Sequence, residues 1–253
     1  MRIIFLGNNW LAWQVLKWLK EQYEEILALV IHPPGKRRYG DEIVKTAQLN
    51  SDYIFDGSQL RLSDRLNAIK ALNPDIGVSV LFGYVLKPEF LGIFPKGVVN
   101  LHPAYLPYNQ GSYPNVWSIV EETPAGATLH FVDSGVDTGD IIARAHVPVE
   151  PVDTGETLYR KSEKASIDLF KDTWPAILSG QVSRMPQPID DGTYHRMNDV
   201  EKIDYIDLDR EYTAKELINV IRARTFPPYS GAYFIYQGRK VYLRLQLLYE
   251  EQL

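Results

Sequence analysis

The chain has 253 residues and 27 basic against 32 acidic side chains, which gives a formal net charge of −5. Apolar residues make up 45% of it, enough for a large core, which excludes a disordered or fibrous chain. The acidic balance argues against a broad nucleic-acid interface, and the lack of cysteine excludes disulfides, thiolate zinc sites and cysteine nucleophiles. Because the first apolar run is too short for a signal peptide and none reaches the length of a membrane span, we expect a cytoplasmic protein without membrane contact.

The first half of the chain alternates short apolar runs with helical patterns. Short, mainly apolar runs predict strands at 3–6, 26–31, 76–81 and 98–101. Apolar residues at helical spacing predict helices at 10–22, 41–49 and 63–72, the last with Ser63 as its N-cap. This alternation is typical of a sheet covered by helices on both faces. We therefore predict an α/β, Rossmann-like fold with a parallel or mixed sheet.

The second half of the chain has a different pattern. Two longer strands are predicted at 125–133 and 140–149, followed by a long helix at 156–178 that Asp153 or Thr154 caps and that kinks near Pro175. The C-terminal part predicts a helix at 214–224 and a β-hairpin of 232–236 and 239–248 around Gln237-Gly238. We divide the chain into a catalytic domain, 1–185, and a small C-terminal extension with this helix and hairpin, 186–253.

The turn after the first strand has only part of a dinucleotide-binding fingerprint. Of the three glycines in G-x-G-x-x-G only Gly7 is present, and Asn9 and Ala12 occupy the other two positions. The turn therefore predicts a tight strand-to-helix connection and no NAD. Helix N-terminal amides and Asn8 and Asn9 are still placed to meet polar groups of a ligand, and we take Asn9 as a candidate substrate-binding residue.

Three polar residues form the candidate catalytic set. Asn100 and His102 lie two apart on a predicted strand, so their side chains project from the same face, and Pro103 ends the strand directly after them. Asp137 lies in a glycine-bounded turn, 135–139. A histidine at such a position is by itself more often structural than catalytic. The aromatic loop 105–114, of a kind that covers sites, strengthens the catalytic interpretation.

These residue types suit acyl transfer to an amine without a covalent intermediate. A histidine can accept the amine proton at neutral pH, an asparagine amide can stabilise the oxyanion, and an aspartate can orient and stabilise the imidazolium. A nucleophile elbow of the form G-x-S-x-G is missing from the sequence. Direct transfer from a carrier is therefore favoured.

The motif around these residues resembles the folate-dependent formyltransferase family over about residues 1–180. The resemblance rests on Asn100-Leu101-His102-Pro103, Leu106-Pro107, Gly111, Pro114, Trp117, Gly126-Ala127-Thr128-Leu129-His130 and Asp137-Thr138-Gly139-Asp140-Ile141-Ile142. It implies 10-formyltetrahydrofolate as co-substrate and Asn100, His102 and Asp137 as catalytic residues. It also implies that backbone groups cradle the pterin, from the loop Phe82, Gly83, Tyr84, Val85 and Leu86 and from the turn with Val136, Gly139 and Asp140. Ala104-Tyr105 departs from the Ser-Leu of many members.

Other histidines and cations have weaker patterns. His130 shares a strand face with Thr128 and is expected to support the site rather than to catalyse. His32, His146 and His195 lack ligand spacing, so we expect no metal. Lys36-Arg37-Arg38 is either a second phosphate contact or an exposed loop.

The amine that is formylated distinguishes branches of this family. Members that act on tRNA usually carry an additional basic domain, and glycinamide-ribonucleotide members are typically shorter. The chain is most similar to the sugar-nucleotide branch through 192–196 and 221–232, which implies a nucleotide-sugar substrate such as dTDP-4-amino-4,6-dideoxyglucose, for surface polysaccharide (O-antigen) synthesis. Formylation of another amine, and a non-catalytic folate- or nucleotide-binding module, remain the alternatives.

Charge and aromatic side chains near the C-terminus suit a nucleotide. Arg222 and Arg224 would meet its phosphates, and Phe226 and Tyr229 its base; Tyr105 is a further candidate substrate contact. The two arginines would equally complete a solvated helix end. The apolar side chains of the predicted hairpin predict a homodimer surface; they are Tyr233, Ile235, Tyr242 and Leu245.

Overall fold

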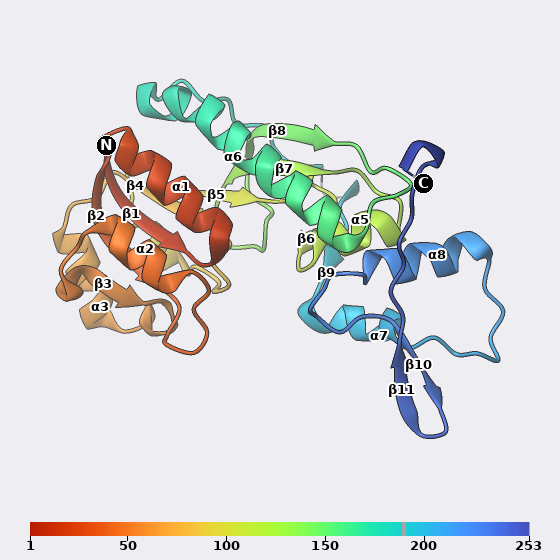
Figure 1. The fold of residues 1–253 in the computed structure, drawn as a ribbon. Coiled ribbons are helices and arrows are strands. Elements are labelled where there is room, and N and C mark those ends of the chain that lie inside the picture. The colour runs from red at the N-terminus through yellow and green to blue at the C-terminus, as the bar shows by residue number, and fades with distance from the viewer. Residues whose placement is uncertain (189–190, 253) are drawn as a thin grey trace. The chain divides into compact units, whose positions relative to one another are not determined.

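The computed structural model describes residues 1–188 and 191–252. Its main feature is a seven-stranded sheet in the order β3-β2-β1-β4-β5-β7-β8 (Figure 1). The strands are β1 (Arg2–Gly7), β2 (Glu25–Ile31), β3 (Ile54–Asp56), β4 (Ile76–Val80), β5 (Val98–His102), β7 (Ala125–Phe131) and β8 (Ile141–Val147). The first five strands are parallel to one another, and β7 is antiparallel to β5. The predicted α/β fold with a mixed sheet is confirmed.

Alternate side chains of the strands bury opposite faces of the sheet. Ile3 and Phe5 of β1 pack with the apolar faces of α1 (Asn9–Glu21) and α2 (Gly40–Ala47). Ile4 and Leu6 point the other way, into a core shared with α3 (Ser63–Ala71) and α4 (Pro88–Leu91). Because both faces are covered, the strands are continuous apolar runs rather than alternating ones. Loops follow the carboxyl ends of β1, β4 and β5.

The remaining helices are α5 (Pro114–Val120), α6 (Gly155–Ser179), α7 (Glu201–Asp204) and α8 (Ala214–Ala223). The hydroxyl of Thr154 accepts from the Thr157 N–H, which confirms the predicted cap at the start of α6. At its end Gly180 adopts φ +70° and the next amide bonds back to Ala176, as a glycine terminator does. The N-cap expected at Ser63 is wrong by one residue, because Leu62 occupies that position and Ser63 is helical.

The chain divides into two compact units that do not follow chain order. The first contains residues 1–102, 128–144 and 166–187, and the second contains residues 103–127, 145–165 and the described part of 188–252. In the second unit α5 and α8 pack against each other, and buried residues such as Val116, Trp117 and Ala223 form its core. The division into 1–185 and 186–253 stays a prediction.

The predicted C-terminal hairpin is present, with a shorter second strand than expected. It consists of β10 (Tyr233–Tyr236) and β11 (Arg239–Tyr242), antiparallel and joined by Gln237 and Gly238, both at positive φ. Two short strands, β6 (Gln110–Gly111) and β9 (Tyr194–His195), pair in parallel. None of the helices in the described part of the chain is both long and apolar enough to cross a membrane.

Candidate active site

Three neighbouring strands each contribute one polar side chain to the site. In the sheet register, Asn100 of β5 lies opposite Ser79 of β4 on one side and opposite His130 of β7 on the other. Residues in register on neighbouring strands project from the same face. The three strands therefore place a hydroxyl, an amide and an imidazole in one row within the first unit.

Hydrogen bonds fix the orientation of the Asn100 amide. Its Oδ1 accepts from the Ser79 hydroxyl at 2.8 Å, and its Nδ2 lies 3.1 Å from Nε2 of His130. Nδ1 of His130 is 2.8 Å from the carbonyl oxygen of Phe131, which can only accept, so this nitrogen carries the proton. Nε2 of His130 then accepts from Asn100, and the amide plane is set by both neighbouring strands.

Asp137 reaches this row from the turn between β7 and β8. Its Oδ1 accepts from Asn100 Nδ2 at 3.4 Å and lies 3.5 Å from His130 Nε2, and its Oδ2 lies 3.7 Å from His102 Nε2. The last distance is too long for a hydrogen bond, so in this geometry the carboxylate acts on His102 through its charge. Only 13% of the Asp137 side chain and 8% of the His102 side chain are exposed, which limits the screening of that charge by water. The structure brings the three residues of the predicted catalytic set together.

The turn that carries Asp137 is held in a compact shape. The Asp133 carboxylate accepts from the Gly135 N–H and from the Thr138 hydroxyl. Gly139 packs so tightly that a Cβ there would lie 2.0 Å from the carbonyl oxygen of Phe131. Asp137 itself has φ 56°, a left-handed conformation that costs energy in a residue with a side chain. The surrounding contacts must therefore stabilise this turn.

The loop predicted to cradle the pterin, 82–86, follows β4 in the same unit. The rings of Phe82 and Tyr84 lie 5.6 Å and 4.8 Å from the His32 ring, and Nε2 of His32 accepts from the Gly83 N–H at 3.3 Å. Burial lowers the pKa of His32, with a further contribution from the nearby Lys36. His32 therefore serves as a neutral acceptor that anchors the loop.

A cavity of about 190 Å³ lies against the second half of this loop. Its lining includes Tyr84, Val85 and Leu86 from the loop together with Gly57 and Phe90. The Val85 side chain is 56% exposed, and Val136 in the Asp137 turn is 37% exposed. Exposed apolar side chains on both segments offer contact area to a flat heterocycle. Among residues 1–188 and 191–252, no group of histidine and carboxylate side chains is arranged to hold a metal ion.

Asn9, the predicted substrate contact of the first turn, is the first residue of α1. It has φ 81°, its Oδ1 accepts from the Trp10 N–H, and its own N–H donates to the carbonyl of Arg38. The Asn8 side chain accepts from the Arg38 N–H as well. These bonds hold the basic loop 36–38 against the carboxyl end of β1. In the second unit, the ring of Tyr105 lies edge-on to His146, with centroids 5.8 Å apart.

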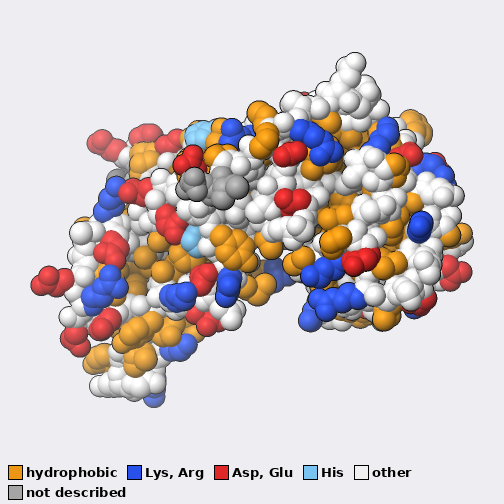
Figure 2. Space-filling view, turned by 180° about the vertical axis from the view of Figure 1, so that it is seen from behind, with side chains coloured by type: hydrophobic (Ala, Val, Ile, Leu, Met, Phe, Trp, Pro, Cys, Tyr) orange, Lys and Arg blue, Asp and Glu red, His pale blue; other side chains and the backbone are white. Residues whose placement is uncertain are grey.

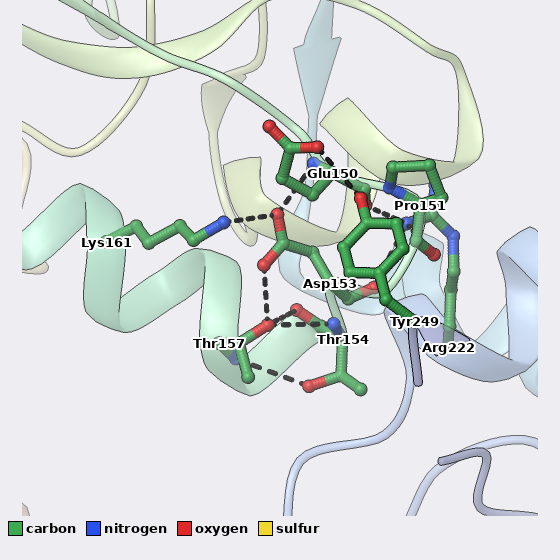
Figure 3. Close-up of polar contacts among 8 residues, drawn as sticks. All are labelled: Glu150, Pro151, Asp153, Thr154, Thr157, Lys161, Arg222 and Tyr249. Carbon is green, nitrogen blue, oxygen red and sulfur yellow. Dashed lines mark hydrogen bonds and ion pairs between the residues drawn. The ribbon is translucent and has the colours of Figure 1, made fainter. Parts of the chain in front are cut away.

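Arg222 is buried and bonded to backbone (Figure 3). Its Nη1 donates to the carbonyl oxygens of Glu150, Pro151 and Asp153 at 2.9, 3.3 and 3.0 Å, and its Nε donates to Asn219. Burial lowers the pKa of this guanidinium, although the charge of Asp153 opposes the change. Arg222 thus ties α8 to the segment before α6.

Arg224 also has a partner, because its Nη2 donates to the Asp204 carboxylate at 2.9 Å in a two-point contact. Phe226 packs between the rings of Tyr159 and Tyr229, each 5.5 Å away. The cation beside this aromatic group is Arg160, 6.0 Å from the Phe226 ring. A binding role for Arg222, Arg224, Phe226 and Tyr229 stays a prediction.

Sequence reasoning missed two residues of the site. Ser79 is the one polar residue within the buried strand β4, and that interruption was the available signal. Gln187 donates its side-chain amide to the carbonyl oxygens of Asp137 and Gly139. It lies 50 residues from Asp137 in a loop-rich stretch, where no pattern marks it. His130, expected to support the site, contacts both Asn100 and Asp137.

Two family models match the sequence. The model described as "Formyl transferase" matches residues 1–173. A second model, described as "N-formyltransferase dimerization C-terminal domain", matches residues 199–249.

Individual relatives differ in the substrate that their names give. The chain is 28% identical to a methionyl-tRNA formyltransferase from Acetivibrio thermocellus, over 100% of this chain and 81% of that protein. The crystal structure of a 4-N formyltransferase from Francisella tularensis matches with a TM-score of 0.84 and 27% identity, over 98% of both chains. A formyltransferase, PseJ, from Anoxybacillus kamchatkensis matches with a TM-score of 0.59 and 30% identity over 80% of this chain and 89% of that one; it was solved with UDP-4,6-dideoxy-4-formamido-L-AltNAc and tetrahydrofolate.

Proposed function

The chain belongs to the formyl transferase family, and we propose that it transfers a formyl group from 10-formyltetrahydrofolate to the amine of a nucleotide-linked amino sugar. The observation that carries this proposal is the position of the Asp137 carboxylate, between the His102 imidazole and the Asn100 amide. A base, an oxyanion donor and a fixed negative charge are the groups that direct acyl transfer to an amine requires.

The folate supplies a formyl carbon that is already activated for attack. In the overall exchange the amine nitrogen bonds to this carbon, the bond from the carbon to the folate nitrogen breaks, and the proton lost by the amine passes to that departing nitrogen. The protein's task is to move this proton and to stabilise the charge on the formyl oxygen.

His102 is the group that takes the proton. Its Nε2 faces the Asp137 carboxylate at 3.7 Å, so a proton gained there meets a negative charge. Two unit charges about 4 Å apart interact by about 4 kcal/mol at an effective dielectric constant near 20. At this distance the pair interacts through charge rather than through a hydrogen bond.

Asn100 is the group that meets the oxyanion. Its Nδ2 lies 3.1 Å from Nε2 of His130 and makes a longer contact of 3.4 Å with the Asp137 carboxylate. The long contact with Asp137 is therefore the one that the formyl oxygen would replace at small cost. Ser79 keeps the amide plane in place during this exchange. A donor of this kind typically contributes about 3 to 4 kcal/mol to the transition state.

Two segments of the first unit suit the pterin of the folate. The loop Phe82–Leu86 and the turn Val136–Asp140 each offer an exposed valine side chain and backbone polar groups, and the loop borders a cavity. Burial of these valines under a flat ring would remove apolar surface from water, which favours binding.

Several observations support a nucleotide sugar as the acceptor. The match to the Francisella 4-N formyltransferase extends over 98% of both chains, and the Anoxybacillus relative was solved with a UDP-linked formamido sugar. The net charge of −5 and the mixture of acidic and basic side chains on the face shown in Figure 2 suit a small molecule better than a polynucleotide. We place the base near Phe226 and Tyr229 and take Asn9 and Tyr105 as further contacts. The match to a dimerization domain supports a homodimer.

Methionyl-tRNA is the second candidate acceptor. The specific observation in its favour is that relatives at 28 to 30% identity over most of this chain are methionyl-tRNA formyltransferases. The same catalytic residues would serve either amine, so the choice lies with the residues that bind the rest of the acceptor.

One experiment distinguishes these acceptors. The purified protein is incubated with 10-formyltetrahydrofolate and, separately, with dTDP-, UDP- and GDP-linked amino sugars, glycinamide ribonucleotide and methionyl-tRNA, and each product is weighed by mass spectrometry. We expect one formyl addition to an amino sugar that carries a nucleoside diphosphate. Formylation of methionyl-tRNA alone would replace the proposed acceptor. A formyl addition to none of these amines would point to a non-catalytic binding module.

A further inference from the structure

A glutamine outside the predicted site holds the turn that carries Asp137. Nε2 of Gln187 donates to the carbonyl oxygen of Asp137 at 2.8 Å and to that of Gly139 at 2.7 Å. Two carbonyl oxygens can only accept, so the orientation of the amide is unambiguous and both of its hydrogens are used. The side chain thus closes the turn from outside by bridging two backbone groups two residues apart.

The segment that carries Gln187 is itself fastened beside the turn. Met185 exchanges two backbone hydrogen bonds with Ile141, the first residue of β8, at 2.8 and 2.9 Å. Arg184 stacks over the Phe131 ring at 3.6 Å and lies 3.7 Å from the Asp140 carboxylate. These contacts pin the segment to both ends of the turn and fix the position from which the amide donates.

The bonded carbonyl belongs to a residue whose backbone is strained. Asp137 has φ 56° and would relax toward a negative φ if the turn were loose. Such a change would rotate its carboxylate away from His102 and Asn100, which lie 3.7 and 3.4 Å away. A displacement of about 1 Å in a reacting group commonly costs about 100-fold in rate.

We propose that Gln187 is a positioning residue for formyl transfer, which keeps the Asp137 carboxylate between His102 and Asn100 by bonding the carbonyl oxygens of Asp137 and Gly139. This inference rests on the proposed role of Asp137. It adds a positioning residue to the three proposed catalytic residues.

The test replaces the amide with an apolar side chain of similar length, Gln187→Met. We expect kcat at saturating folate and amine to fall about 10- to 100-fold, with the KM of the amine within about two-fold of the parent value. The melting temperature should stay within about 2 °C, because the lost bonds lie at a partly exposed turn. Gln181→Met is the matched control: Gln181 is exposed just beyond α6, and full activity is expected for it.

A double-mutant cycle shows whether Gln187 acts through Asp137. In an Asp137→Asn background, Gln187→Met should lower kcat by less than about two-fold, because the charge that it positions is already gone. An equal loss of kcat in both backgrounds would overturn the proposal and make Gln187 a general support of the fold. Full activity of Asp137→Asn by itself would instead refute the proposed role of Asp137, which keeps the two failures distinct.

A second variant separates hydrogen-bond donation from packing. Gln187→Glu keeps the shape of the side chain, but its carboxylate cannot donate; once protonated, it regains one donor. We expect its activity relative to the parent, measured at each pH, to rise as the pH falls from 7.5 to about 5. A constant ratio over this range would contradict a role in donation.

Discussion

Nε2 of His130 accepts a hydrogen bond from the side-chain amide of Asn100 across the β5–β7 register, at 3.1 Å. This contact distinguishes the roles of two histidines that both lie near the Asp137 carboxylate. His130 is locked as an acceptor by its bond to the Phe131 carbonyl, whereas Nε2 of His102 lies 3.7 Å from the Asp137 carboxylate, beyond hydrogen-bond distance. We therefore expect the two histidines to respond differently to substitution.

His102→Gln should remove the base and keep the site intact. We expect kcat to fall about 10²- to 10⁴-fold, the usual contribution of general base catalysis, with little change in the KM of either substrate. Steady-state kinetics with the accepted amine measure both constants. A variant that turns over at near the parent rate would show that another group accepts the proton.

His130→Leu should leave the Asn100 amide held on one side only. We expect kcat to fall about 10-fold, because the oxyanion donor is less well aligned but still present. Ser79→Ala removes the opposite support and should have a smaller effect of the same kind, since the hydroxyl bonds the amide oxygen and not its donor. If His130→Leu lowered kcat as much as His102→Gln, the two histidines would not have the separate roles inferred here.

Arg222→Met should lower stability strongly. The substitution leaves three backbone carbonyl oxygens, those of Glu150, Pro151 and Asp153, without their donor, and the contact with Asp153 is buried. We expect a loss of about 3 kcal/mol in the free energy of unfolding, measured by urea denaturation. Arg239→Met, an exposed arginine of β11, is the matched control and should change it by less than about 0.5 kcal/mol. A stable Arg222→Met protein with a raised KM for the nucleotide sugar would instead favour the phosphate contact predicted from sequence.

Glu163 should make stability depend on pH. Burial raises the pKa of this carboxyl, and the hydrogen bond from Arg160 offsets that only in part. The folded state binds this proton more tightly than the unfolded state does. The protonated carboxyl therefore contributes its full stabilisation of the fold below the unfolded pKa, and this stabilisation is lost as the pH rises through the higher folded pKa. Glu163→Gln does not titrate, so its melting temperature relative to the parent should increase between about pH 4.5 and 8.

The control for this measurement is Asp172→Asn, an exposed residue of the same helix, whose melting temperature relative to the parent should not follow that course. A difference between Glu163→Gln and the parent that stays constant over the range would mean that the carboxyl titrates alike in the folded and unfolded states.

The sequence by itself determined the parts that depend on local pattern. The long apolar strands, the cap at Thr154 and the Gln237-Gly238 hairpin all follow from period, capping and turn chemistry within a few residues. The spacing of Asn100 and His102 on one strand also fixed that both project from one face. The three-residue strand β3 was missed, because so short a run has no measurable period.

Only the tertiary structure decided which distant residues meet. Ser79 and His130 flank Asn100 because β4 and β7 are the sheet neighbours of β5, and strand order is not written in any single segment. The same holds for Gln187, which reaches Asp137 through a segment paired with β8, and for Arg222, whose guanidinium donates to backbone carbonyls far away in the sequence. Local propensity acts over a few residues, whereas these contacts depend on how strands pair and how loops return, and that is settled only when the whole chain has packed.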